Sequence, residues 1–299
     1  MPTALVDWKQ TIKHQEVLKM KIKFYGTGAG GGIPEIFCCC RVCEYARKHG
    51  GKEIRSRTQA VIDDCLGLEF PIDTFAHTAY RGLDMRKIKH IVITHAHGDH
   101  FMPSEAISRP QGIDEIHFYA SEASGQGLKN TLDRIEQQYR DGTRKKTSDY
   151  RVLLHPLEHY KTYDINGYHI TPLRARHHEN LQSCLYIIRK EGKSIFWGFD
   201  TGKFHQDVLD YIEQSGEKFD FVVLDCTLKE NNQITDSHMD LTWCSEMKDK
   251  LIEMGAVTAE TRVFVSHIGH LVEKTHEEMC EAAARYGMEV AYDGLEVEI

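Results

Sequence analysis

Residues 94–100 read Thr-His-Ala-His-Gly-Asp-His, and this stretch directly follows a short apolar run. The run, His90–Thr94, predicts a buried strand, so the three histidines and the aspartate lie on the loop at its end. The first two histidines alternate and can face one point, whereas the aspartate and the third histidine can face a second point nearby. Imidazole nitrogens and carboxylates are ligands for zinc, manganese or iron. The spacing therefore predicts a metal centre rather than a run of surface histidines.

Three further candidate ligands lie downstream, each just after a predicted strand. The strands are Tyr168–Leu173, Ser194–Phe199 and Arg262–Ser266, and the segments that carry the ligands are Arg176-His177-His178-Glu179, Asp200-Thr201-Gly202 and Ser266-His267-Ile268-Gly269-His270. A histidine, an aspartate and a second histidine at strand ends extend the pattern that begins at residue 94.

A cysteine motif, Cys38-x-Cys40-x-x-Cys43, suggests a second kind of metal site. Three thiolates at this spacing can surround a tetrahedral zinc, and His270 is the candidate for the fourth ligand that is missing locally. Cys39 would then be a bystander. The alternative is a set of buried or redox-active cysteines. The odd number of cysteines, 9, in a chain without a recognisable secretory signal argues against a disulfide framework.

A glycine loop, Gly26-x-Gly28-x-x-Gly31, follows the predicted strand Lys21–Tyr25 and matches the dinucleotide fingerprint. That fingerprint requires a helix whose N-terminus points at the pyrophosphate. Here Gly32-Ile33-Pro34 and the cysteine motif follow instead of a helix. We therefore interpret the loop as a place where the backbone passes close to another part of the structure, such as a metal centre.

The histidine motif and its downstream partners resemble those of the metallo-β-lactamase superfamily. The glycine loop, the cysteine motif, the pair His267 and His270, and a hairpin expected around Asp293-Gly294 resemble one branch of it. That branch contains the phosphoribosyl 1,2-cyclic phosphate phosphodiesterase, with relatives near PQQ synthesis protein B and the tRNA 3′-processing nucleases. The resemblance implies an α+β fold, a four-layer αββα sandwich. It covers one hydrolase domain, residues 21–299, and leaves residues 1–20 as an N-terminal extension.

The resemblance also implies a ligand set for two divalent ions, zinc or manganese. His95, His97 and His177 would hold the first ion, Asp99, His100 and His267 the second, and Asp200 would bridge them; Cys38, Cys40, Cys43 and His270 would hold an additional structural zinc. The neighbouring His178 is an alternative to His177, which is favoured because a small residue, Ala175, stands two positions before it.

The implied chemistry is hydrolysis of a phosphodiester. Two metal ions would activate a water molecule and bind the phosphoryl oxygens, and Asp99 would orient the nucleophile. His238 is the candidate acid that protonates the leaving alkoxide, although a helix-capping or surface position is the alternative for it. Asp225 could hold a ligand imidazole. Arg57 and Thr58 could contact substrate or be structural.

Composition limits the partners. The 299 residues carry 37 Lys and Arg against 45 Asp and Glu, a net charge of −8, which disfavours binding of long nucleic acid. A basic cluster, Arg140, Arg144, Lys145, Lys146 and Arg151, is interpreted as a solvated loop, with a rim that attracts anions as the alternative. The apolar runs are too short for a membrane span, and the expected location is the cytoplasm. A homodimer is an implication of the resemblance alone.

The most favoured substrate is a small phosphate ester, including cyclic ones. A lactone or thioester hydrolase, or a PQQ-pathway protein of the same fold, is the alternative; an RNA nuclease ranks third, and a metal sensor without activity ranks last. A further strand is expected at Phe219–Leu224 and a hairpin over Met288–Ile299. Helices are expected at Leu128–Tyr139, Trp243–Met254 and Glu277–Tyr286.

Overall fold

Two seven-stranded sheets form the body of the molecule in the computed structural model, which describes residues 19–107, 115–145 and 151–299. The first sheet has the order β14 (Glu296–Glu298), β1 (Lys21–Gly26), β2 (Gln59–Ile62), β3 (Leu66–Leu68), β4 (His90–Val92), β5 (Glu115–Ser121) and β6 (Arg151–Leu157). The second has the order β13 (Glu289–Val290), β12 (Arg262–Ser266), β11 (Phe221–Asp225), β10 (Lys193–Gly198), β9 (Cys184–Lys190), β8 (Tyr168–Arg174) and β7 (Tyr163–Ile165).

Apolar side chains alternate between the two faces of the central strands, which explains why these strands read as continuous apolar runs. In β10, Ile195 and Trp197 point into the space between the sheets, whereas Phe196 points outward under the helices. Phe24 of the first sheet stacks on Trp197 of the second with ring centroids 5.7 Å apart. The sheets therefore pack face to face around one apolar core.

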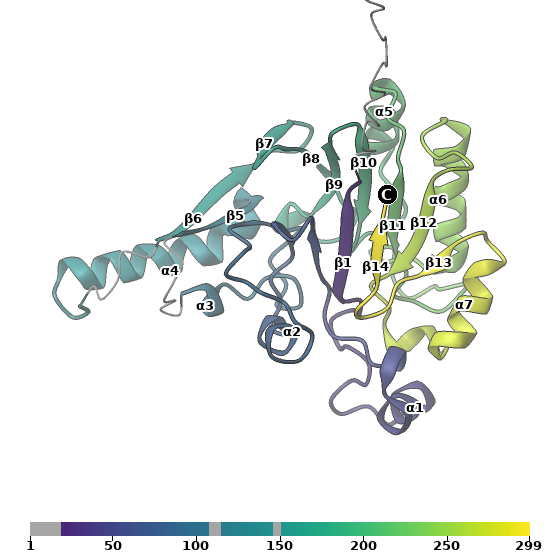
Figure 1. The fold of residues 1–299 in the computed structure, drawn as a ribbon, viewed down its shortest axis with the longest axis horizontal. Coiled ribbons are helices and arrows are strands. Elements are labelled where there is room, and N and C mark those ends of the chain that lie inside the picture. The colour runs from purple at the N-terminus through teal and green to yellow at the C-terminus, as the bar shows by residue number, and fades with distance from the viewer. Residues whose placement is uncertain (1–18, 108–114, 146–150) are drawn as a thin grey trace, which may run out of the picture.

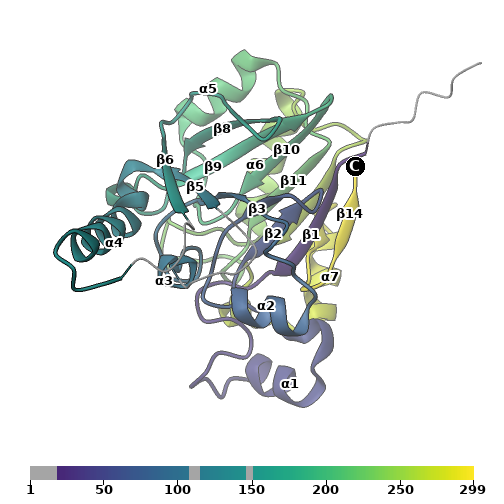
Figure 2. The same cartoon turned by 60° about the vertical axis from the view of Figure 1, so that its left-hand side comes forward.

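Helices cover the outer faces and complete an αββα sandwich (Figures 1 and 2). Helices α1 (Arg41–His49), α5 (Gln206–Ser215), α6 (Leu241–Glu253) and α7 (His276–Ala284) contribute buried side chains to the core outside the second sheet. Helices α3 (Pro103–Ala106) and α4 (Glu122–Arg140) pack on the first sheet, and α2 (Thr74–Tyr80) lies near them. The fold expected from the sequence is confirmed.

Most predicted elements agree with the structure to within a few residues, but two differ. Helix α4 begins at Glu122 rather than Leu128, because the Ser121 hydroxyl accepts a hydrogen bond from the Ser124 amide and caps it. The predicted hairpin over residues 288–299 is wrong, since β13 and β14 belong to different sheets. The buried carboxylate of Asp293 accepts hydrogen bonds from the amides of Thr27 and Ser56, which directs the two strands apart.

The loops that carry the candidate ligands follow β4, β8, β10 and β12, and they meet at the edge of the sandwich near α1 and α2, at the bottom of Figure 1. None of the helices within the described ranges is long and apolar enough to cross a membrane. Residues 1–18 of the expected N-terminal extension, and Lys146 of the basic cluster, lie outside the described residues. Met20 already pairs with Ile299 through two backbone hydrogen bonds.

Candidate metal centre

Four side chains from three loops form the first group of convergent ligands: His95, His97, His177 and Asp200. His97 Nδ1 lies 2.8 Å from His95 Nε2 and 3.2 Å from His177 Nε2. Asp200 Oδ2 is 3.1 Å from His95 Nε2. The structure brings His177 into this group, while the ring of His178 lies 5.1 Å from that of His97 and its nitrogens are not part of the group.

The second group shares Asp200 with the first and adds Asp99, His100 and His267. His100 Nε2 lies 2.9 Å from Asp200 Oδ2, 3.3 Å from Asp99 Oδ2 and 3.1 Å from His267 Nε2. The same oxygen, Asp200 Oδ2, is thus within 3.1 Å of an imidazole nitrogen in each group. This carboxylate stands where a bridging ligand would.

Two of these residues have unusual backbone conformations. Asp200 and His267 both have positive φ angles, 48° and 55°. Non-glycine residues adopt this region at a cost, and such strain is concentrated at functional sites. Each residue comes within two positions of the end of a buried strand, so the turn directs its side chain toward the common edge.

The donor set fits divalent cations. Three imidazole nitrogens of the first group point at one another, and hydrogen atoms cannot satisfy all of these short contacts because neutral imidazole carries one N–H. Asp200 Oδ1 is buried and accepts no hydrogen bond within the described residues. Buried acceptors that face one another are repulsive unless a cation or protons lie between them. The nitrogen and oxygen atoms match the ligand preferences of zinc and manganese.

The protonation properties of the ligands follow from the same geometry. Burial lowers the pKa of His95 to about 3, which keeps its imidazole neutral and its lone pair available. Burial also opposes protonation of His267, but the adjacent carboxylates, Asp200 foremost, outweigh it and raise the pKa to about 10. In the absence of cations, protons therefore compensate the carboxylates, and metal binding must displace them.

His238 lies on the loop before α6, beside the two metal groups. Its Nδ1 is 3.2 Å from Asp225 Oδ2 and 3.2 Å from Asp200 Oδ1. Burial opposes protonation of His238, but Asp225 and then Asp200 outweigh it and raise the pKa. Asp225 also lies 3.2 Å from His267 Nδ1, so one buried carboxylate contacts both imidazoles. This arrangement suits a proton donor more than a surface histidine.

The cysteine motif and His270 form a separate convergent group. His270 Nδ1 lies 3.2 Å from Cys38 Sγ and 3.6 Å from Cys40 Sγ, and its Nε2 lies 2.7 Å from a Glu35 oxygen. Burial opposes ionisation of Cys40, but hydrogen bonds from the Cys43 backbone and His270 lower its pKa to about 6. Cys39 is exposed and outside the group. Three sulfurs and one nitrogen are a zinc-binding set.

The glycine loop contacts the neighbouring backbone and the second metal group, as expected for a close approach. A Cβ at Gly26 would lie 1.9 Å from the Arg57 carbonyl oxygen, and one at Gly30 would lie 3.4 Å from Asp99 Oδ2. Arg57 donates to the Gly30 carbonyl and to Asp73. The structure thus gives Arg57 a role in holding the loop, and Thr58 donates to the Gly28 carbonyl in the same way.

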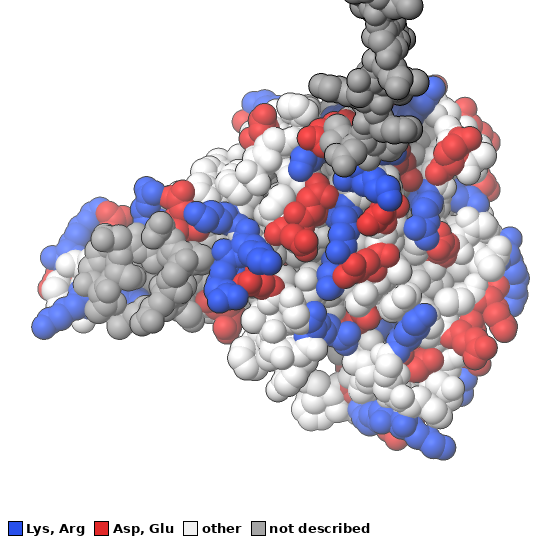
Figure 3. Space-filling model, in the orientation of Figure 1, with Lys and Arg blue, Asp and Glu red and all other residues white. Residues whose placement is uncertain are grey.

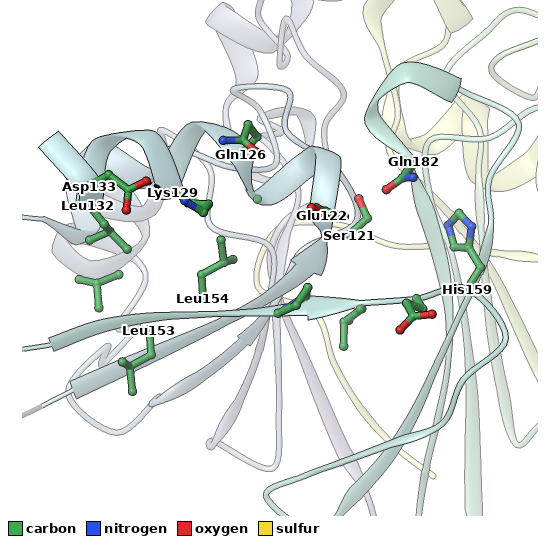
Figure 4. A pocket seen from close by; sticks show the side chains of 15 residues that line it. Ser121, Glu122, Gln126, Lys129, Leu132, Asp133, Leu153, Leu154, His159 and Gln182 are labelled. Carbon is green, nitrogen blue, oxygen red and sulfur yellow. Dashed lines mark hydrogen bonds and ion pairs between the residues drawn. The ribbon is translucent and has the colours of Figure 1, made fainter.

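Sequence reasoning missed Glu69, which is 1% exposed and lies 3.5 Å from His100 Nδ1. The available signal was weak: one carboxylate at the end of the short apolar run Leu66–Leu68. It also missed a cavity of about 680 Å³ between α4 and β6 (Figure 4). None of the residues of the metal groups lines this cavity, so it lies outside them.

The basic cluster lies at the end of α4 and on β6. Arg140 pairs with Glu136, and Arg151 pairs with Glu115. Figure 3 shows basic and acidic side chains mixed on the visible face of this arm. These pairs support the interpretation of a solvated surface.

Residues 60–292 match the model of the beta-lactamase superfamily domain, and the chain belongs to that family. The fold, with two sheets between helices and convergent His and Asp side chains on the loops at one edge, agrees with this assignment. A search of curated proteins returned no match.

Several solved structures share the fold at low sequence identity. A diphosphatase from the PhnP family aligns over 94% of this chain and 98% of its own, with a TM-score of 0.69 and 21% identity. Zinc-bound PqqB from Methylobacterium extorquens aligns over 93% and 100%, with a TM-score of 0.62 and 16% identity. The short form of human tRNase Z aligns over 93% and 98%, with a TM-score of 0.59 and 15% identity.

Proposed function

We propose that the protein is a two-metal hydrolase that cleaves small phosphate diesters, including cyclic ones. The observation that carries the proposal is Asp200, whose Oδ2 lies about equally far from imidazoles of two separate ligand groups. Zinc or manganese would occupy the two groups, and a third ion, zinc, the cysteine group. Two divalent ions bound there would bind phosphoryl oxygens and lower the pKa of a water molecule toward 7.

The side chains have distinct roles in this proposal. His95, His97 and His177 hold the first position, His100 and His267 the second, and Asp200 spans both. Asp99 belongs to the second group and faces Gly30, so it can also orient the attacking water. The contacts of His238 Nδ1 with Asp225 and Asp200 favour the protonated imidazole, and the proton on its other nitrogen, Nε2, is the one it delivers to the leaving oxygen.

A general acid such as His238 suits a substrate that releases an alkoxide, as a phosphodiester or a lactone does, more than a thioester, which releases a thiolate. An alkoxide leaving group needs a proton, and although burial opposes protonation of His238, Asp225 and Asp200 raise its pKa and so favour the protonated form. The name of the PhnP-family diphosphatase points to phosphate chemistry in one protein of this fold. An RNA nuclease is less favoured, because the arginines at the two ends of the basic cluster are each paired with a carboxylate.

The test is hydrolysis of bis(p-nitrophenyl) phosphate and of a ribose cyclic phosphate by protein loaded with manganese or zinc. Asp99→Asn should lose activity, whereas Asp133→Asn, which removes an exposed carboxylate on α4, should not. Measurement of bound metal separates the two parts of the proposal. If two active-site ions bind but only lactones or thioesters react, the phosphodiester assignment is wrong.

A further inference from the structure

We propose that a second cavity, next to the loop that carries Asp99, binds an anionic end of the substrate, and that Arg57 and Arg81 recognise that end. The inference rests on the proposed function and adds a substrate class to it. The phosphodiester would carry a substituent that ends in an oxyanion, a phosphate or a carboxylate. The cavity has a volume of about 440 Å³ and lies between α2, the glycine loop and residues 54–57. No residue of the metal groups lines it.

Positive charge dominates the lining of this cavity. Among the described residues, three arginines and a single carboxylate line it: Arg55, Arg57, Arg81 and Asp73. The lining histidine, His77, is neutral near pH 7 because burial lowers its pKa to about 4. Glu35 stands between two lining residues in the sequence but points at His270 Nε2, 2.7 Å away. An excess of fixed cations in a recess attracts anions and raises their local concentration.

The guanidinium groups of Arg57 and Arg81 retain donors for a ligand. Arg57 donates from Nε to the Gly30 carbonyl and from Nη1 to Asp73, and its Nη2 has no partner among the described residues. Arg81 forms an ion pair in which Nη2 lies 3.0 Å from Asp293 Oδ2, and within the described part of the chain its Nε and Nη1 have no polar partner. The two side chains are 22% and 27% exposed, so they are largely held in place. The fixed fork of a guanidinium matches the oxygens of phosphate and carboxylate.

Two walls of the cavity adjoin the loop that carries Asp99. Gly31 lines the cavity, and a Cβ on the preceding glycine, Gly30, would lie 3.4 Å from Asp99 Oδ2. Asp73 lines the cavity too, and the amide of the residue before it donates to the Gly98 carbonyl at 3.3 Å. The two glycines place no side chain between the cavity and the second metal group. A phosphodiester bound at that group therefore has the cavity beside it.

The size and the remaining lining of the cavity favour an organic group over a free ion. Ile36, before α1, and Tyr80, at the end of α2, line the cavity and are 69% and 82% exposed. Such side chains contact the carbon skeleton of a ligand rather than its charge. Cavities of about 300–1,000 Å³ are typical of sites for small organic molecules. We therefore assign the cavity to a substituent of the substrate and not to free phosphate.

The test uses p-nitrophenyl phosphodiesters whose other substituent is an alkyl chain of varied length. The chain ends in a methyl, a carboxylate or a phosphate group. Release of p-nitrophenolate by the metal-loaded enzyme gives kcat/KM for each ester, and the quantity compared is the ratio between a charged ester and the methyl-ended ester of the same length. Because p-nitrophenolate leaves without a proton, this ratio is independent of His238.

Four variants separate charge from shape and from folding. Ala76→Glu introduces a carboxylate at a position of α2 that lines the cavity, and Ala76→Gln has the same size without the charge. Ala79→Glu places the same charge at an exposed position of α2 outside the cavity. Arg81→Gln removes one guanidinium. Since Arg81 also pairs with the buried Asp293, thermal unfolding of this variant checks that it is folded.

We expect wild type to prefer the charged esters by about 10- to 100-fold, the scale of one hydrogen bond to a charged group, with a maximum at one chain length. Ala76→Glu and Arg81→Gln should lower that preference by about tenfold or more, and Ala76→Gln should lower it less. Ala79→Glu should keep the wild-type ratio. Equal kcat/KM for charged and methyl-ended esters in wild type, or equal ratios in Ala76→Glu and Ala79→Glu, would overturn the inference.

The remaining outcomes distinguish other sources of the same effect. A preference that is the same at every chain length would show general attraction by the metal centre and would count against the cavity. Inorganic phosphate that changes kcat for a methyl-ended ester without competing with it would indicate a site for the free ion, and the assignment to substrate would be wrong. If wild type binds two active-site ions and hydrolyses none of the esters, the proposed function itself fails.

Discussion

At the scale of single residues, His238 connects the metal groups to the proposed proton transfer. Its Nδ1 is held between two carboxylates, so its other nitrogen is the one available to a leaving group. We expect His238→Ala to lower kcat/KM for an alkyl phosphodiester by about 10²- to 10⁴-fold, the usual contribution of a general acid. A p-nitrophenyl diester should be affected far less, because p-nitrophenolate leaves without a proton. Steady-state kinetics on both substrates, with metal content as control, checks this, and equal losses would contradict it.

His77 gives a pH-dependent contribution to stability. It is completely buried between Ser56 and Gln59, and burial lowers its pKa to about 4. The unfolded chain, with a pKa near 6.5, binds the proton more readily, so stability is full above pH ~6.5 and is lost as the pH falls toward 4. The free energy of unfolding should fall by roughly 3 kcal/mol, because each unit of pKa difference between the folded and unfolded states is worth about 1.4 kcal/mol. Urea unfolding at pH 7 and pH 4.5 should show a smaller drop in His77→Gln than in wild type or in the exposed-site control His49→Gln.

The candidate ligands could be predicted from the sequence because their spacing and their positions after apolar strands are local properties. Asp225 could also be predicted from the sequence, since it directly follows such an apolar run. Glu69 could not be predicted, because in the sequence a single carboxylate after a three-residue strand cannot be distinguished from a surface residue. Its importance depends on the closeness of His100, 31 positions later in the chain.

At the scale of elements, the loop that carries His238 packs against the turn that carries Asp200. A Cβ at Gly202 would lie 1.6 Å from the Asp236 carbonyl oxygen, so Gly202→Ala must displace that loop. We expect the variant to bind metal but to lose activity toward alkyl diesters, as His238→Ala does. Gly127→Ala on α4 is the control, since its Cβ meets no atom within 4 Å. It should retain activity and gain about 0.5–1 kcal/mol of stability. Wild-type kinetics in Gly202→Ala would contradict the argument.

Strands were predictable where burial on both faces gives a continuous apolar run. The start of α4 was not, because residues 122–127 contain two glycines that weaken the helical pattern. The structure explains one of them, since a Cβ at Gly125 would lie 2.8 Å from a Leu154 methyl group. The hairpin at residues 288–299 failed for a different reason: Asp293 makes its hydrogen bonds with residues more than 200 positions away.

At the scale of the whole molecule, the cysteine group joins the start of α1 and the segment before it to the loop after β12. Cys38 and His270 are 232 positions apart, so a zinc ion there would act as a long-range cross-link. Cross-links that close loops of 100 residues or more stabilise by on the order of 4 kcal/mol. We expect Cys38→Ser to lose one zinc per chain and to unfold at lower temperature. Cys39→Ser, at an exposed cysteine outside the group, should change neither quantity. Equal zinc content in both variants would contradict the assignment.

The pairing of β1 with β14 has a consequence for the order of folding. Their ends are tied by Lys19 and Glu298, which are 279 positions apart, and β1 also pairs with β2 on its other side. Contacts between such distant segments require the closure of a very long loop and slow the search for the native state. During synthesis, β1 is made before β14, and nearly the whole domain separates the two strands in the sequence. The outer edge of β1 therefore stays unpaired until β14 has been made. Until then, the newly made chain depends on rapid synthesis of β14 to keep this edge from pairing with another chain.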